Sequence, residues 1–239
     1  MLERTAYDML AKWKQDSDGT ALLVDGARQI GKTFLIEEFA RREYPSFIKV
    51  DFIEDSQLAT TLAAAMNARQ AIEALTLASG RRVVPGETLV FLDEVQEAQN
   101  LVTLSKYLVQ DGRFPLVMSG SMLGVELGHV RSFPVGFLRE ERMYPLSFSE
   151  FCDALNVPRT IWETLEECFS EGLPADEQTH ERLLRVFRLY AVIGGMPRSV
   201  QAYLDNGFDL GAARQTQENL VALYREDMVK HAGDRALQV

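Results

Sequence analysis

A segment near the N-terminus has the spacing of a loop that binds phosphate groups. Glycines at two of its positions let the backbone turn sharply and approach oxygen atoms closely. Successive N–H groups at the start of a helix then form an anion nest. A lysine reaches the outer phosphates, and a threonine hydroxyl can complete the coordination of Mg²⁺. The segment reads Gly26, Ala27, Arg28, Gln29, Ile30, Gly31, Lys32 and Thr33, which fits Gly-x-x-x-x-Gly-Lys-[Ser/Thr].

The residues around this segment favour the phosphate-binding interpretation over an accidental glycine turn with a solvated lysine. An apolar run at 21–24 predicts a buried strand before it. Residues 34–40 place apolar side chains at helical spacing after it. Strand, glycine loop and helix are the order that the motif needs. The expected nucleotide-binding residues are those at 26–33 together with Phe34, which directly follows them.

Two adjacent carboxylates, Asp93 and Glu94, follow a second apolar run at 89–92. Four apolar residues in succession predict a strand that is buried on both faces. Ligands of an open α/β sheet bind at the carboxyl edge of its strands. We therefore expect Asp93 to hold the magnesium ion with Thr33, and Glu94 to activate the attacking water, with Lys32 at the phosphates. Alone, the pair would be an ordinary strand end with solvated acids, but the glycine loop upstream favours the Walker B interpretation.

Ser119 and Arg131 are further candidates for catalysis. The apolar run at 116–118 leads to Ser119 and Ser121. Ser119 follows the run directly and is the stronger candidate for a sensor of the γ-phosphate, although hydroxyls that cap a turn explain the pattern equally well. Arg131 lies in the next loop and is a candidate arginine finger for a neighbouring copy. A surface arginine is the simpler interpretation.

The remaining pattern predicts two domains. Strands are expected at 21–24, 47–52, 89–92, 116–121 and 137–144, with an N-terminal helix at 2–14. Strand signals stop at Pro145, which predicts an α/β core over 1–145 and an all-helical lid over 146–239. Within the lid, Gly194 to Arg198 interrupt an apolar run. They are interpreted either as a helix stop and start, or as a turn that brings Pro197 and Arg198 to the nucleotide.

Composition argues against several classes of function, although a local basic patch stays possible. The 239 residues carry a formal net charge of −10, which argues against broad binding to nucleic acid or anionic membrane. The sequence contains no apolar stretch long enough to span a bilayer. Cys152 and Cys168 have no metal-site spacing and indicate idle thiols in a cytoplasmic protein.

Taken together, these segments resemble the AAA+ class of ATPases. The closer resemblance is to prokaryotic ATPases with an AAA_14-type core, usually followed by a DUF4143 domain, which are similar to archaeal-type and STAND ATPases. The resemblance rests on residues 26–33, 92–96, 119–121, 132–136, 144–151 and 194–197, in the order of the family. It implies a P-loop NTPase fold, a three-layer α/β/α sandwich with a mainly parallel sheet in the order 5-1-4-3-2. It further implies a helical lid, ATP or ADP, Mg²⁺ and the option of a homo-oligomer.

The sequence departs from the family pattern at two points. Phe137 stands where many relatives carry a basic residue, and the chain stops at Val239 whereas relatives continue, so we expect an N-terminal fragment or a shortened paralogue. The expected function is Mg-ATP hydrolysis coupled to lid movement. A nucleotide-gated switch that hydrolyses slowly or not at all is the alternative, and a small-molecule P-loop kinase is disfavoured by the acidic pair and the long helical part.

Overall fold

The computed structural model describes residues 2–16, 18–97, 101–121 and 136–232, and the chain divides into two compact units. Residues Arg4–Tyr144 form the first unit, which is called the α/β unit below. The second, the helical unit, comprises the chain from Pro145 onward with the segment that ends at Glu3. Arg131 and the expected family segment at 132–135 lie outside the described residues.

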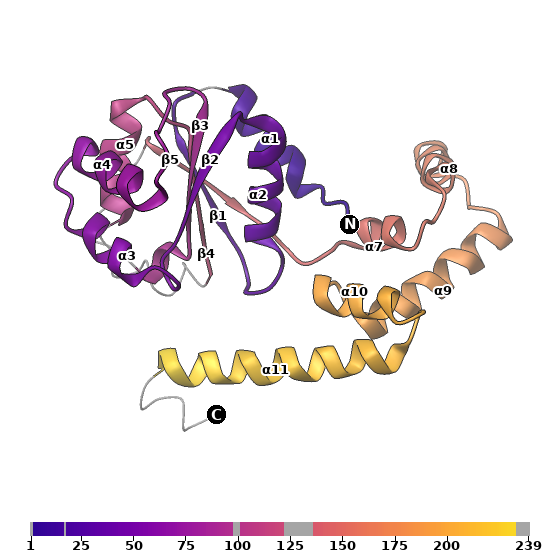
Figure 1. Cartoon of the computed structure of the whole chain (residues 1–239). Helices are drawn as coiled ribbons and strands as arrows, with labels where there is room; N and C mark the ends of the chain where they lie inside the picture. Colours follow the sequence, from indigo (N-terminus) through magenta and orange to yellow (C-terminus); the bar gives the residue numbers. More distant parts are fainter. Residues whose placement is uncertain (1, 17, 98–100, 122–135, 233–239) are drawn as a thin grey trace. The chain divides into compact units, whose positions relative to one another are not determined.

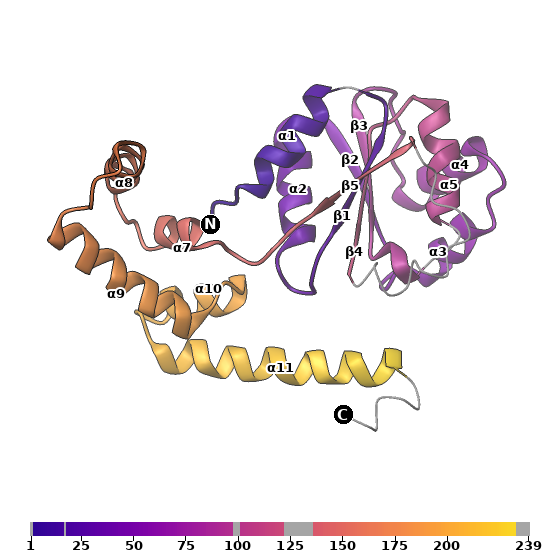
Figure 2. The same ribbon diagram turned by 180° about the vertical axis from the view of Figure 1, so that it is seen from behind.

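The α/β unit is built on a five-stranded sheet in the order β2-β3-β4-β1-β5, in which all neighbouring strands are parallel. This confirms the expected order. Figures 1 and 2 show α1 and α2 on one face of the sheet and α3, α4 and α5 on the other. The elements are α1 (Ala6–Asp16), β1 (Ala21–Asp25), α2 (Lys32–Glu43), β2 (Ser46–Asp51), α3 (Ser56–Ala63), α4 (Ala68–Ser79), β3 (Thr88–Asp93), η1 (Val95–Glu97), α5 (Leu101–Asp111), β4 (Leu116–Gly120) and β5 (Leu138–Arg142).

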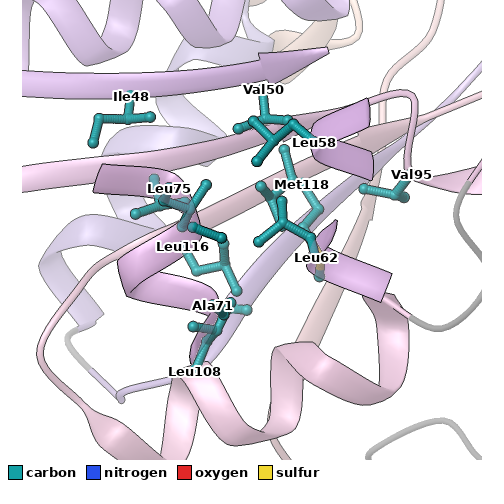
Figure 3. Close-up of a cluster of buried hydrophobic side chains, with 14 of the residues drawn as sticks. Ile48, Val50, Leu58, Leu62, Ala71, Leu75, Val95, Leu108, Leu116 and Met118 are labelled. Atoms are coloured by element: carbon teal, nitrogen blue, oxygen red, sulfur yellow. The ribbon is translucent and has the colours of Figure 1, made fainter. Parts of the chain in front are cut away.

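The central strands explain why the apolar runs in the sequence are continuous rather than alternating. Every residue of β1, β3 and β4 is buried, since helices cover both faces of the sheet. Figure 3 shows the core between the sheet and the helices α3 to α5, with Leu62 and Leu75 near Met118. Strand β5 lies at the edge of the sheet and carries the charged sequence Leu-Arg-Glu-Glu-Arg, half-buried or exposed. Strand β5 covers Leu138–Arg142 and is therefore shorter than the strand expected at 137–144.

The N-terminal helix begins later than expected, at Ala6 rather than at residue 2. Arg4 donates through Nη1 to the carbonyl oxygen of Ile30 at 2.8 Å and through Nη2 to that of Tyr144 at 2.5 Å. The Arg4 side chain therefore links two backbone segments through hydrogen bonds, whereas Leu2 packs in the core of the helical unit. Amphipathic spacing over 2–13 cannot distinguish such an anchored segment from helix.

The helical unit contains α7 (Phe148–Ala154), α8 (Arg159–Glu171), α9 (Glu177–Ile193), α10 (Pro197–Asp205) and α11 (Leu210–Ala232). Helix α7 begins with a capping box between Ser147 and Glu150. Gly195 lies against the backbone of Leu146, whose N–H donates to the Gly195 carbonyl at 2.7 Å. A Cβ at position 195 would lie 2.3 Å from the Leu146 carbonyl oxygen, so only glycine fits there.

Candidate functional site

The glycine loop adopts the sharply turned backbone that its sequence predicts. Gly26, Gln29 and Gly31 all have positive φ angles, of 153°, 63° and 90°. Gly31 is the N-cap of α2 and has no side chain that could bond the first helical N–H groups. These N–H groups, together with the positive end of the helix dipole, make the start of α2 suited to an anion.

Lys32 lies inside this loop. Its side chain is buried, and its Nζ donates to the carbonyl oxygens of Gly26 and Ala27, both at 2.8 Å. Burial lowers the pKa of the Lys32 ammonium, while the negative charges of Glu94, Asp25 and Asp93 oppose that shift. The lysine is thus held close to the acidic pair by the loop itself.

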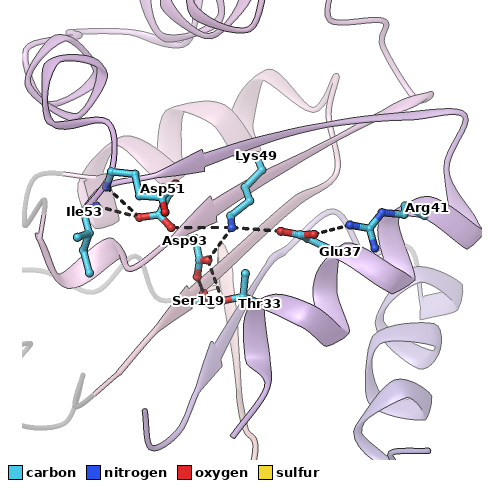
Figure 4. A network of polar contacts seen from close by, with 9 residues as sticks. Thr33, Glu37, Arg41, Lys49, Asp51, Ile53, Asp93 and Ser119 are labelled. Carbon is cyan, nitrogen blue, oxygen red and sulfur yellow. Dashed lines mark hydrogen bonds and ion pairs between the residues drawn. The ribbon is translucent and has the colours of Figure 1, made fainter. Parts of the chain in front are cut away.

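The end of β3 and the start of α2 meet at Asp93. The Thr33 hydroxyl donates to Asp93 Oδ2 at 2.8 Å, and the Ser119 hydroxyl donates to Asp93 Oδ1 (Figure 4). Asp93 and Ser119 are buried and Thr33 is half-buried. The structure therefore brings together the two residues expected to hold magnesium, from segments 60 residues apart. It places the side chain of Ser119 against the carboxylate of Asp93.

Lys49, on β2, is a residue that the sequence interpretation did not select. Its ammonium lies 3.1 Å from Glu37 Oε1, 3.4 Å from Asp93 Oδ2 and 3.8 Å from Asp51 Oδ2 (Figure 4). Burial lowers the pKa of this ammonium, but the hydrogen bond to Glu37 and the charges of the carboxylates outweigh burial and raise the pKa. The signal in the sequence is weak, because Lys49 is one of two charged residues in the strand expected at 47–52.

Glu94 lies beside a hydrogen-bonded pair, Gln96 and Ser121. Gln96 donates through Nε2 to Glu94 Oε2, and the Ser121 hydroxyl donates to the same oxygen at 3.2 Å. The Ser121 backbone N–H donates to Gln96 Oε1 at 3.3 Å, and Arg28 Nε of the glycine loop donates to the Ser121 hydroxyl at 3.3 Å. Glu94 has a φ of 55°, uncommon for a residue with a side chain, which these contacts hold in place.

A second ion pair anchors the start of the loop. Arg142 of β5 donates to Asp25 Oδ2 through Nη2 at 2.9 Å and through Nε at 3.2 Å. Asp25 is buried at the end of β1, and its carbonyl accepts from Met143 N–H at 2.7 Å. The loop therefore begins from a position fixed by both backbone and side-chain contacts.

The remaining expected site residues within the described ranges are Phe34, Pro197 and Arg198. Phe34 is in the first turn of α2 with 55% of its surface exposed. Pro197 is the first residue of α10, and Arg198 is exposed beside it in the helical unit. Their approach to a nucleotide, like the role of Arg131, stays a prediction.

The oxygen donors at Asp93 fit magnesium. A hydroxyl and a carboxylate are hard ligands, and Mg²⁺ in phosphate sites is held by one or two protein ligands with substrate oxygens and water. Across the described residues no cluster of three or more His, Cys, Asp or Glu side chains is arranged to hold a metal. None of the helices in the described ranges is long and apolar enough to cross a membrane.

The parallel five-stranded sheet, with a glycine loop between β1 and α2 and a carboxylate at the end of β3, defines the P-loop NTPase fold. A family model described as an AAA domain, AAA_14, matches residues 18–152, more than half of the chain. The chain belongs to this AAA family, and membership supports nucleotide binding.

Several solved structures are similar to this chain. The Walker-type ATPase PABY2304 of Pyrococcus abyssi is similar over 98% of this chain and 77% of that chain, with 14% identity and a TM-score of 0.56. PCH-2 of C. elegans is similar over 89% and 67%, with 12% identity and a TM-score of 0.47. AMPPCP-bound DnaA from Aquifex aeolicus is similar over 97% and 69%, with 15% identity and a TM-score of 0.47. Among curated proteins none matches the sequence.

Proposed function

We propose that this protein binds Mg-ATP, hydrolyses it to ADP and phosphate, and couples hydrolysis to movement of the helical unit. One observation carries the proposal. The Thr33 hydroxyl, at the end of the glycine loop, lies 2.8 Å from the Asp93 carboxylate. The phosphate-binding segment and the acidic segment therefore converge on one point, where a single metal ion can contact both.

The binding roles follow from the contacts. The N–H groups at the start of α2 hold phosphate oxygens, and Lys32 moves its ammonium from the loop carbonyls to the outer phosphates. Thr33 and Asp93 hold magnesium, which, when bound, offsets charge on the phosphate oxygens. Ser119 orients Asp93 through the hydrogen bond to Oδ1, a positioning role that we propose in place of a direct contact with the γ-phosphate.

Glu94 is the proposed general base. It follows Asp93 directly, so its carboxylate lies at the same edge of the sheet as the loop. It orients the attacking water and accepts its proton as the bond from the water oxygen to the γ-phosphorus forms and the bond from the γ-phosphorus to the bridging oxygen of ADP breaks. Gln96 and Ser121 hold the Glu94 carboxylate through Oε2.

A lysine pair tests the binding step. Lys32→Ala removes the buried loop ammonium, whereas Lys12→Ala removes an exposed lysine on α1. Isothermal calorimetry with ATP and Mg²⁺ is expected to give no measurable binding for Lys32→Ala and the affinity of the parent for Lys12→Ala. Equal affinity of the parent and Lys32→Ala would exclude this loop as the phosphate site.

A glutamate pair tests the chemical step. Glu94→Gln keeps the size of the side chain and removes the base, while Glu87→Gln makes the same change next to the opposite end of β3, where Glu87 is exposed. We expect Glu94→Gln to bind ATP like the parent and to release phosphate at least about a hundredfold more slowly. Full activity in Glu94→Gln would remove Glu94 from the mechanism. Small-angle scattering with and without nucleotide measures whether the helical unit moves.

The contacts of Glu94 also favour a second candidate, a nucleotide-gated switch in which hydrolysis is rare. A base that accepts hydrogen bonds from both Gln96 and Ser121 is less available to water. Steady-state phosphate release separates the two functions. Tight nucleotide binding with a rate equal to that of buffer supports the switch, whereas a rate that Glu94→Gln abolishes supports the ATPase.

A further inference from the structure

Lys49 lies among three carboxylates that come from three different elements. Its own strand β2 supplies Asp51, β3 supplies Asp93, and α2 supplies Glu37. Figure 4 shows the Lys49 ammonium at the centre of this network. Only 26% of the Lys49 side chain is exposed, so this cluster is not an ordinary surface ion pair.

The contact with Asp93 is the unusual one. The oxygen that faces Lys49 at 3.4 Å is Oδ2, the same atom that accepts the hydrogen bond from Thr33. A buried carboxylate without a cation is costly, so a positive charge at this point stabilises Asp93 when no metal is present. The same charge repels a divalent cation that approaches Asp93.

The other charged groups around Lys49 strengthen the repulsion between Lys49 and a divalent cation at Asp93. Arg41 pairs with Glu37, one turn along α2, and thereby balances one of the three carboxylates. Asp51 accepts hydrogen bonds from the backbone N–H groups of Ile53 and Glu54, at 3.0 and 3.2 Å. With Glu37 and Asp51 already bonded elsewhere, Lys49 is the cation that forms an ion pair with Asp93 among the described residues. Lys32 also interacts with Asp93 electrostatically, and removal of Lys49 leaves Asp93 with that weaker interaction.

We propose that Lys49 acts as an internal counter-ion of Asp93, which keeps magnesium out of the site until a nucleotide brings phosphate oxygens to it. This inference rests on the proposed function, because it concerns the same metal site. It makes Lys49 a positioning residue that sets the order of binding. Magnesium binds with the nucleotide and not before it.

Titration of MgCl₂ into the nucleotide-free protein tests the inference directly. The variants are Lys49→Met, which keeps the length of the side chain and removes the charge, and Lys49→Arg, which keeps the charge. Lys14→Met is the matched control, since Lys14 forms a half-buried ion pair with Glu43 at 2.8 Å, away from this cluster. Calorimetry measures the dissociation constant for Mg²⁺, and thermal unfolding measures stabilisation by Mg²⁺.

We expect Lys49→Met to bind Mg²⁺ at least about tenfold more tightly than the parent, and to melt at a higher temperature when Mg²⁺ is added. The parent, Lys49→Arg and Lys14→Met are expected to show neither effect at the same concentrations. If Lys49→Met does not fold without Mg²⁺ but folds when Mg²⁺ is added, this recovery supports the inference. If Lys49→Met does not fold even with Mg²⁺, Lys49→Gln takes its place in the titration. A charge-free variant that folds and binds Mg²⁺ no more tightly than the parent overturns it.

A second titration, of Mg²⁺ in the presence of a fluorescent ATP analogue, separates this inference from the proposed function. If the parent binds no nucleotide while Lys49→Met still binds Mg²⁺ alone, the proposed function fails and the counter-ion role stands. If the parent binds nucleotide while Lys49→Met needs the same Mg²⁺ concentration as the parent in both titrations, the counter-ion role fails and the proposed function stands.

Discussion

Gly26 lies where the phosphate loop leaves β1 and passes the backbone after β5, and replacing it by alanine adds one methyl group at that point. The new Cβ would lie 2.3 Å from the Met143 carbonyl oxygen and 2.7 Å from Ile30 Cδ1. The Ile30 methyl group can rotate away. The Met143 carbonyl cannot, because Met143 N–H is bonded to the Asp25 carbonyl at 2.7 Å. Either the loop or the edge strand must therefore shift by about 1 Å.

The expected cost of Gly26→Ala has two parts. Forcing a methyl group into a packed site costs about 1–3 kcal/mol. A φ of 153°, which residues with a side chain rarely adopt, costs about 1–3 kcal/mol more. A loss of roughly 3 kcal/mol in the free energy of unfolding lowers the melting temperature of a unit of this size by about 6–12 °C. Displacing the loop by about 1 Å also spoils the geometry of its hydrogen bonds to phosphate oxygens, and so lowers its affinity for nucleotide.

Gly31→Ala is the matched control for this substitution. Gly31 also has a positive φ, of 90°, but the nearest atom to a Cβ there is Arg4 Nη1 at 3.9 Å. The control therefore carries backbone strain without a clash, and costs about 1–2 kcal/mol. Thermal unfolding of both variants measures the difference in stability, and calorimetry with nucleotide measures the difference in affinity.

A melting temperature of Gly26→Ala within about 2 °C of that of Gly31→Ala would show that the clash with Met143 contributes nothing to stability, contrary to this prediction. A Gly26→Ala variant that loses stability but keeps the nucleotide affinity of the parent would contradict the expected displacement of the loop. It would show that the loop does not shift, and that the strand β5 absorbs the added methyl group.

Three further outcomes are expected. Gln96→Ala lowers kcat of phosphate release about tenfold or more with little change in KM, because the candidate base loses a hydrogen bond that orients it; an effect confined to KM would contradict this role. Gly195→Ala is expected to lower the melting temperature of the helical unit more than Gly172→Ala. A Cβ at position 195 would lie 2.3 Å from a carbonyl oxygen, whereas a Cβ at position 172 meets nothing within 4 Å. Scanning calorimetry should therefore show unequal shifts of the melting temperature in the two variants. Burial covers the Cys152 thiol and raises its pKa to about 11, so iodoacetamide at pH 8 is expected to label Cys168 and not Cys152 in the folded protein. Mass spectrometry that finds rapid labelling of Cys152 at pH 8 would disprove this prediction.

Sequence patterns predicted most of the α/β unit because its strands are buried on both faces. Continuous apolar runs such as those at β1 and β3 have few other interpretations when a glycine loop and a helix follow. The strand order came from the family resemblance, since runs of apolar residues do not specify which strands are neighbours. The charged edge strand β5 and the anchored segment before Ala6 were less predictable, because tertiary contacts decide their conformation.

The sequence predicted only those residues of the candidate site that belong to short, contiguous motifs. Lys32, Thr33 and Asp93 belong to short motifs with fixed spacing, so the sequence alone indicates them. Lys49 and Arg142 act through partners on other strands, and the pair Arg142–Asp25 spans 117 residues. No local pattern encodes such a contact. A lysine inside the strand expected at 47–52 is the signal that would have drawn attention to Lys49.

The bonding around the loop also limits where nucleotide affinity can come from. Lys32 already donates to two loop carbonyls, and Thr33 already donates to Asp93. At these two side chains a bound nucleotide therefore exchanges hydrogen bonds rather than adding them, and exchanges of this kind contribute only about 1 kcal/mol each. The net gain must come instead from charge, because carbonyl dipoles around Lys32 are replaced by phosphate, which carries full negative charge. Affinity for this site is thus expected to rise with the charge of the phosphate chain, so that ATP and ADP bind far more tightly than AMP or adenosine.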